Sequence, residues 1–175
     1  MIRYAITDPK YYSLKYLQHL NNKTDYILLR DKTTNDYKSL AKEFMQASKE
    51  FSYKKMLHQD YMLAHNLGAF GVHLTSNQFN DISKAKELGL FVVISTHSFS
   101  QIELAQKLGA NAVTFSPIFK TPNKGEPKGI NALKDAIKRF DIKIIALGGI
   151  VSDKEIEQVK ATKAWGFASI RYFAL

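Results

Sequence analysis

A basic, hydroxyl-containing loop and a pair of glycines are the residues of this chain best suited to hold a phosphate. The loop Ser116–Gly125 follows a short apolar run and carries Thr121 and Lys124. A second apolar run further along the chain ends directly in Gly148 and Gly149. Glycine lets a backbone approach an anion closely, and lysine supplies positive charge. The pattern therefore predicts a phosphate site formed by these two segments.

Eight short apolar runs separated by amphipathic segments are the elements that must position this site. The intervening segments repeat apolar residues at helical spacing, for example Leu14, Leu17 and Leu20. The strand candidates are Arg3–Ile6, Tyr26–Leu29, Lys55–Leu57, Phe70–Leu74, Phe91–Ser95, Ala112–Phe115, Lys143–Leu147 and Gly166–Ile170. Strands that alternate with helices pair in parallel through right-handed crossovers.

Eight such units predict a compact α/β fold, a (β/α)8 TIM barrel that forms a single domain over residues 1–175. The chain continues for only five residues beyond Ile170, so we expect the last helix to be missing. An uncovered barrel flank would favour a homodimer or rearranged termini. An open doubly wound sheet is the alternative fold.

In a TIM barrel the functional residues lie where the strands end. The residues expected to face that pocket, besides the two segments above, are Arg30, Lys32, His58, His73, Ser95, His97, Ile170 and Arg171. Histidine titrates nearest to neutral pH, which makes it the natural acid–base candidate. We take His73 and Lys124 as the predicted catalytic pair. A lone histidine is nevertheless more often structural than catalytic.

Composition narrows the classes of function. The net charge is +9 and there is no cysteine, which excludes a disulfide framework and thiolate chemistry. The basic residues are scattered rather than clustered, which favours a small anionic ligand over nucleic acid. No apolar run reaches the length of a membrane span and the N-terminus lacks a signal-peptide layout, so we expect a cytoplasmic protein without membrane contact.

Six motifs in order resemble those of thiamine-phosphate synthases and the related thiazole tautomerases, over nearly the whole chain. Gly71–Leu74 matches the family's Gly-Val-His-Leu, and Leu29–Lys32 is similar to its Leu-Arg-Glu-Lys. The other motifs are Tyr4–Asp8, Ser95–Ser98, Ser116–Lys124 and Ala146–Ile150.

The resemblance implies ligands that are phosphorylated thiazole or pyrimidine molecules. The synthase joins a pyrimidine diphosphate to thiazole phosphate and expels pyrophosphate. By matching positions, Lys32, Ser95, Thr121 and Lys124 would hold the pyrophosphate or the thiazole. The thiazole phosphate would lie against Gly149 and the Ile170–Arg171 backbone, and Arg30 would be a pocket arginine or part of a structural ion pair.

The departures from the family concern magnesium and the pyrimidine. The synthase uses two aspartates for Mg²⁺, but this chain has His58 and Gln59 at one place and Gln78 at the other. Asp60 would replace one of them only after a register shift, and the pyrimidine-recognising glutamine is Leu28 here. Divalent Mg²⁺ prefers anionic oxygen ligands. We therefore predict no metal site, and Mg²⁺ as a cofactor only if the synthase interpretation holds.

Three hypotheses follow. The first is a thiamine-pathway enzyme, either synthase-like or a tautomerase that moves protons on a thiazole. The tautomerase histidine is Pro117 here, so His73, His97 or His58 would have to act instead. The second is a catalytically degenerate protein that only binds a phosphorylated thiamine intermediate. The third, suggested by net charge alone, is a nucleic-acid binder.

Overall fold

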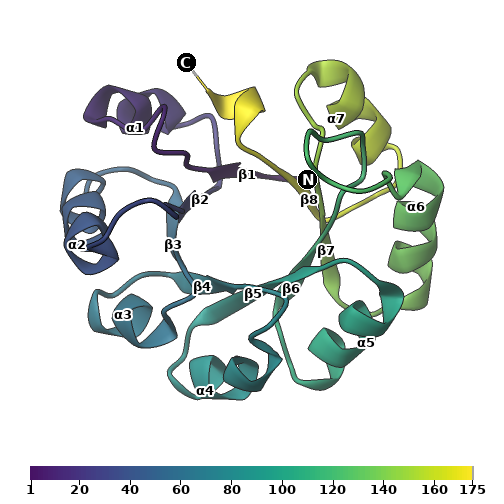
Figure 1. The fold of residues 1–175 in the computed structure, drawn as a ribbon, viewed down its shortest axis with the longest axis horizontal. Helices are drawn as coiled ribbons and strands as arrows, with labels where there is room; N and C mark the ends of the chain where they lie inside the picture. The colour runs from purple at the N-terminus through teal and green to yellow at the C-terminus, as the bar shows by residue number, and fades with distance from the viewer. Residues whose placement is uncertain (175) are drawn as a thin grey trace.

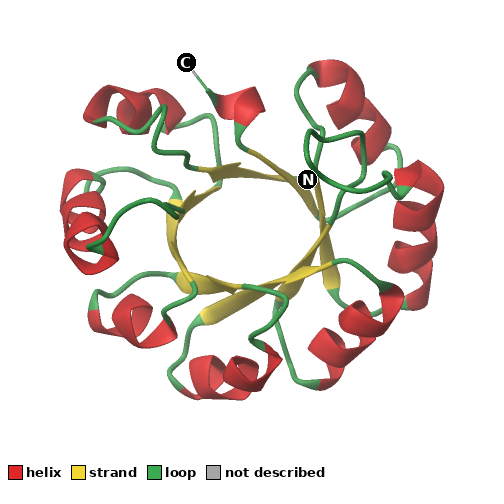
Figure 2. Ribbon diagram, viewed as in Figure 1, coloured by secondary structure: helices red, strands yellow, loops and turns green. Residues whose placement is uncertain are grey.

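The computed structural model describes residues 1–174, which form one closed barrel of eight parallel strands (Figures 1 and 2). The strands are β1 (Ile2–Ile6), β2 (Tyr26–Leu29), β3 (Lys54–His58), β4 (Gly71–Leu74), β5 (Phe91–Thr96), β6 (Ala112–Phe115), β7 (Lys143–Leu147) and β8 (Gly166–Ser169). Each strand pairs with the next, and β8 pairs with β1. The predicted TIM barrel is confirmed, and the open-sheet alternative is wrong.

Closure depends on a glycine at the last seam. Ile2 is the register partner of Gly166, and a Cβ atom built on Gly166 would overlap the Ile2 side chain. All eight predicted strands exist; β2, β6 and β7 have the predicted bounds, and the others differ by one residue at one or both ends. The third, for example, extends from Lys54 to His58, and the eighth ends at Ser169.

Seven α-helices surround the strands as an outer ring within residues 1–174 (Figure 2). They are α1 (Leu14–Leu20), α2 (Tyr37–Ala47), α3 (Tyr61–Asn66), α4 (Ile82–Glu87, preceded by the 3-10 helix η1, Phe79–Asp81), α5 (Phe99–Lys107), α6 (Gly129–Arg139) and α7 (Asp153–Lys160). Helix α7 begins with a capping box, in which Glu155 accepts the Ser152 backbone N–H at 2.9 Å. Gly68, Gly89 and Gly109 follow helix ends with positive φ.

The segment after β8 is a single 3-10 turn, η2 (Arg171–Phe173), and no α-helix follows it within residues 1–174, as expected. In Figure 1 this turn lies between α1 and α7 in the helix ring. Phe173 is buried and stacks on Phe167 with 5.8 Å between ring centroids. The Tyr172 hydroxyl donates to Asp153 of α7 at 2.8 Å. The turn therefore fills part of the position that a last helix would occupy. The single domain over residues 1–175 stays a prediction, and Leu175 lies outside the described residues.

Alternate residues of each strand face opposite sides of the barrel wall. Val72 and Leu74 of β4 point outward into the core beneath the helices. The second core fills the barrel interior and includes Tyr4, Met56 and Val93. His73 lies between the two outward residues of β4, so its side chain points into the barrel.

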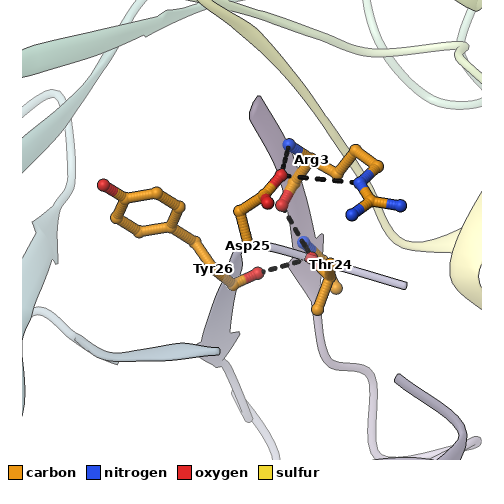
Figure 3. A network of polar contacts seen from close by, with 5 residues as sticks. Arg3, Thr24, Asp25 and Tyr26 are labelled. Carbon is orange, nitrogen blue, oxygen red and sulfur yellow. Dashed lines mark hydrogen bonds and ion pairs between the residues drawn. The ribbon is translucent and has the colours of Figure 1, made fainter. Parts of the chain in front are cut away.

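The amino end of the barrel is closed by polar and aromatic contacts. Arg3 of β1 donates its backbone N–H to Asp25 at 2.6 Å, and its guanidinium lies 3.5 Å from the same carboxylate oxygen (Figure 3). The Thr24 hydroxyl lies 2.7 Å from the Arg3 carbonyl oxygen and 2.9 Å from that of Tyr26. Lys54 lies over Phe70, 4.2 Å from the ring centroid. The Arg3 and Thr24 contacts brace β1 against β2, and the Lys54 contact joins β3 to the segment before β4, opposite the end where the functional residues were predicted.

None of the helices formed by residues 1–174 combines the length and the apolar character needed to cross a bilayer.

Candidate functional site

A cavity of about 760 Å³ opens at the carboxyl ends of the strands. Nine of the ten residues predicted for the site line it: Arg30, Lys32, Ser95, Thr121, Lys124, Gly148, Gly149, Ile170 and Arg171. The tenth, His73, does not line it. His58, Thr75, Ser76 and His97 line it as well, as their places after strand ends predict.

Among the lining residues that were not expected at the pocket are Asp8, Lys10 and Tyr11, from the loop after β1. Asp8 ends a motif that resembles the family, but the loop carries no phosphate-type pattern that would place it in the site. The signal was available, since the loop after the first strand of a closed barrel opens at the same face as the others.

Most of the charged side chains that line the cavity are positive. Five cationic side chains line it, namely Lys10, Arg30, Lys32, Lys124 and Arg171, against one carboxylate, Asp8. In the part of the chain that the structure describes, none of these five cations forms a salt bridge. Unpaired cations around one concave surface raise the local concentration of anions. The arrangement suits a ligand with more than one negative charge.

Gly148 and Gly149 join the end of β7 to the loop that follows β6. The Ile118 and Phe119 backbone N–H groups donate to the carbonyls of Leu147 and Gly148 at 2.9 and 3.0 Å. Both glycines have positive φ, 98° and 73°. A Cβ atom on Gly149 would lie 2.6 Å from Phe119 Cβ, closer than real atoms approach. The close contact between the two loops therefore requires glycine at these positions. The sequence pattern had instead predicted that the glycines contact an anion.

Backbone donors face the cavity from two neighbouring strand ends. The N–H groups of Gly149 and Ile150, after β7, have no acceptor among residues 1–174. The same holds for Ile170 and Arg171, after β8, within the described residues. All four residues line the cavity together with Lys124. Free backbone N–H groups beside a cation are suited to oxyanion binding.

At the ends of β3 and β4 the side chains are engaged in structural contacts. Gln78 accepts hydrogen bonds from the Thr75 N–H and hydroxyl, both at 3.1 Å, and its amide donates to the Gln59 carbonyl at 3.1 Å. Asp60 caps α3 by accepting the Leu63 N–H at 2.8 Å. Gln78 therefore clamps the two loops together, and Asp60 is committed to a helix end.

These residues do not fit a magnesium ion. Asp8 is the one carboxylate that lines the cavity, and it already accepts the Lys10 N–H at 3.0 Å. In the described part of the chain no group of three histidine, cysteine or acidic side chains converges. Neutral amides and imidazoles beside five cations lack the anionic oxygens that this ion requires.

His73 lies one layer below the cavity floor. It is 3% exposed, and both ring nitrogens have partners. Its Nδ1 lies 3.1 Å from the Tyr4 hydroxyl and its Nε2 lies 3.1 Å from the Ser95 hydroxyl. Burial, with smaller contributions from His58 and Arg30, lowers the pKa of His73 to about 3. His73 is therefore neutral at physiological pH and touches the cavity only through Ser95.

Two other histidines line the cavity itself. Burial, with help from Arg30 and Lys32, lowers the pKa of His58 to about 4. His97 has its Nδ1 3.1 Å from the Ser116 carbonyl oxygen. The Ser116 hydroxyl lies 3.2 Å from the same Nδ1, so this nitrogen donates to the carbonyl or accepts from the hydroxyl, depending on the tautomer. His97 Nε2 has no hydrogen-bond partner among residues 1–174, whereas both ring nitrogens of His73 have one.

A family model described as "Thiamine monophosphate synthase" matches residues 3–173. Among curated proteins, "Putative thiamine-phosphate synthase 2" of Aquifex aeolicus is 33% identical over 97% of this chain and 96% of its own length. "Thiamine-phosphate synthase" of Proteus mirabilis is 27% identical over 84% of this chain and 71% of its own.

A solved structure, "Thiamine phosphate pyrophosphorylase" from Pyrococcus furiosus, has the same fold. It superposes with a TM-score of 0.83 and 23% identity, covering 97% of this chain and 85% of that one.

Proposed function

Because this chain belongs to the thiamine monophosphate synthase family, we propose that its cavity binds thiazole phosphate or thiamine phosphate. The single observation that carries the proposal is the set of free N–H groups after β7 and β8, which share the cavity with Lys124. The phosphate lies against Gly149, Ile150, Ile170 and Arg171. These N–H groups come directly after β7 and β8, and the closed barrel fixes the ends of both strands before an anion binds.

Lys124 and Thr121 cover this phosphate from the loop after β6. Lys124 is exposed at the cavity rim and supplies charge. The Thr121 hydroxyl donates to the Phe119 carbonyl at 2.9 Å and lies 3.2 Å from where a Gly148 Cβ would be. Thr121 therefore holds the loop against the glycine pair, and this contact brings Lys124 to the phosphate.

A second anionic group binds elsewhere in the cavity. Arg30 and Lys32 after β2 and Ser95 at the end of β5 line the cavity away from the ends of β7 and β8. This group is the diphosphate of a pyrimidine co-substrate in the transferase reaction. There the cations stabilise the leaving pyrophosphate while a bond forms between the pyrimidine carbon and the thiazole nitrogen. The residues at the ends of β3 and β4 provide no set of metal ligands for this step.

Calorimetry and an activity assay test the proposal. We expect thiazole phosphate to bind, and the Lys124→Ala variant to bind it more weakly. Incubation with thiazole phosphate and a pyrimidine diphosphate, with and without Mg²⁺, would then be followed by chromatography for thiamine phosphate. Formation of thiamine phosphate identifies a transferase. Tight thiazole phosphate binding without turnover identifies a binder or an isomerase, and absence of binding overturns the proposal.

A thiazole tautomerase is the second candidate function, and the free Nε2 of His97 favours it. Aromatisation requires a base that removes a proton from a ring carbon and an acid that returns one. His97 lines the cavity and is the group placed for this transfer. A His97→Gln variant would lose aromatisation of the thiazole tautomer while it still binds thiazole phosphate. Equal activity of the variant and the wild type would exclude this role.

The homodimer and the cytoplasmic location stay predictions. Sedimentation of the purified chain tests the first, and fractionation of cells that produce it tests the second.

A further inference from the structure

A hydrogen-bonded chain of three side chains runs from the barrel interior to the cavity. Tyr4 of β1 lies 3.1 Å from His73 Nδ1, and His73 Nε2 lies 3.1 Å from the Ser95 hydroxyl at the end of β5. Tyr4 is fully buried and His73 almost so, whereas Ser95 is half-buried and lines the cavity. The Tyr4 and His73 rings also stack, with centroids 5.7 Å apart.

The direction of these hydrogen bonds follows from the burial of Tyr4. A neutral imidazole has one nitrogen that donates and one that accepts. His73 Nδ1 is the only partner of the Tyr4 hydroxyl within residues 1–174. If Nδ1 carried the proton, the buried Tyr4 O–H would have no acceptor, which is costly in a protein interior. Tyr4 therefore donates to Nδ1, and the proton of His73 is on Nε2.

The two neutral rings support this assignment. Burial, together with Tyr37 and Tyr26, raises the pKa of Tyr4 well above its ordinary value, so the hydroxyl keeps its proton. Burial lowers the pKa of His73 to about 3, so its ring is neutral at physiological pH. With Nε2–H donating to Ser95 Oγ, that oxygen is an acceptor toward His73. The Ser95 O–H is then free to point into the cavity.

We infer that Tyr4 and His73 are positioning residues that turn the Ser95 hydroxyl into a hydrogen-bond donor for a phosphoryl oxygen of the bound ligand. The ligand in this statement rests on the proposed function, whereas the hydrogen-bond chain does not. A second consequence is that Ser95 is not a nucleophile, because His73 Nε2 has no lone pair to take its proton. The trio therefore binds an anion and does not form a covalent intermediate.

Nitrogen-15 NMR of the imidazole rings tests the assignment in the ligand-free protein. We expect a protonated Nε2 and an unprotonated Nδ1 for His73 at neutral pH. In Tyr4→Phe the His73 signals should change, because Nδ1 loses its donor. The matched control is Tyr26→Phe, which removes another hydroxyl from the barrel interior and should leave His73 unchanged. A protonated Nδ1 on His73 in the wild type would overturn the inference, whatever the protein binds.

A double-mutant cycle with inorganic pyrophosphate tests the effect on the ligand. We expect Ser95→Ala to weaken binding about tenfold, the loss of one hydrogen bond to a charged group. Tyr4→Phe should weaken binding severalfold when Ser95 is present and by less than about twofold in the Ser95→Ala background, since the two act as one unit. Equal effects of Tyr4→Phe in both backgrounds would overturn the positioning role. Failure of the wild type to bind any phosphorylated probe would instead overturn the proposed function and the ligand part of this inference, while the tautomers remain measurable.

Discussion

The carboxyl ends of β6–β8 and those of β3–β4 belong to the same cavity wall but are organised in different ways. At β6–β8 the groups suited to an anion are backbone N–H groups and Lys124, held by glycines and by hydrogen bonds between loops. At β3–β4 the polar side chains bind one another, as the Gln78 clamp shows. The first region is arranged for a ligand and the second for its own stability.

This difference shows which features of a family site tolerate substitution. An anion site made of backbone depends on glycine geometry, so few sequences form it. A site made of side-chain carboxylates is lost when an amide of the same shape takes the place of an acid, and the barrel still closes. We therefore expect the barrel fold to predict the proposed phosphate site better than it predicts a metal site.

Gly149→Ala is expected to have the largest effect, because it breaks the β6–β8 region. The left-handed backbone and the contact with Phe119 together should cost about 2–4 kcal/mol of the free energy of unfolding. Urea denaturation measures the loss. Gly109→Ala is the matched control, since its φ is 83° but nothing lies within 4 Å of the new Cβ. It should cost only about 1–2 kcal/mol, and equal losses would contradict the loop-contact argument.

Acid should destabilise the protein through the β3–β4 region. His73 has a pKa of about 3 when folded and an ordinary value of 6.5 when unfolded. As the pH falls below 6.5 the unfolded chain gains a proton that the folded chain does not. The stability present above that pH is therefore lost as the pH drops toward 3, by at most about 1.4 kcal/mol per unit.

Denaturation of wild type and His73→Gln between pH 7 and about pH 4 would isolate this contribution from that of the carboxylates. The variant should show a flatter decline with falling pH. His65→Gln, which changes an exposed histidine of α3, is the control and should follow the wild type. Parallel curves for all three proteins would show that His73 is not a source of acid sensitivity.

Lys124→Ala sharpens the comparison on the ligand side. Removal of a charge-assisted hydrogen bond should weaken thiazole phosphate binding by about 1–3 kcal/mol, with little change in stability because the residue is exposed. Calorimetry measures the affinity. Lys120→Ala, in the same loop but not lining the cavity, should bind like the wild type. An unchanged affinity for Lys124→Ala would count against the phosphate site after β6.

The smallest expected effect is that of magnesium on the β3–β4 region. Since one carboxylate lines the cavity, a titration of the ligand-free protein with MgCl₂ should show no site of micromolar affinity. Pyrophosphate should bind in EDTA at least as well as in Mg²⁺. A Mg²⁺ site of micromolar affinity, or pyrophosphate binding that requires Mg²⁺, would contradict this expectation. It would show that the β3–β4 region also contributes to ligand binding.

Local sequence patterns determined the elements of this protein and most of its site. Apolar runs such as Ala112–Phe115, broken by glycines and helix caps, identify all eight strands because burial in a parallel sheet requires such runs. In a closed barrel all strands run toward one face, so several polar residues at the ends of the runs line the cavity, as Arg30 and Ser95 do. Both the strands and the residues at their ends can be predicted because they depend on residues that are adjacent in the sequence.

The tertiary structure decided what each polar group does there. Strand alternation places the His73 side chain inside the barrel. There the Tyr4 hydroxyl, from a strand far away in sequence, forms a hydrogen bond with its Nδ1. Contact between the loop after β6 and the end of β7 explains why Gly149 is a glycine. Whether a side chain faces a ligand, another loop or the core depends on partners far away in sequence, and only the closed barrel brings those partners together.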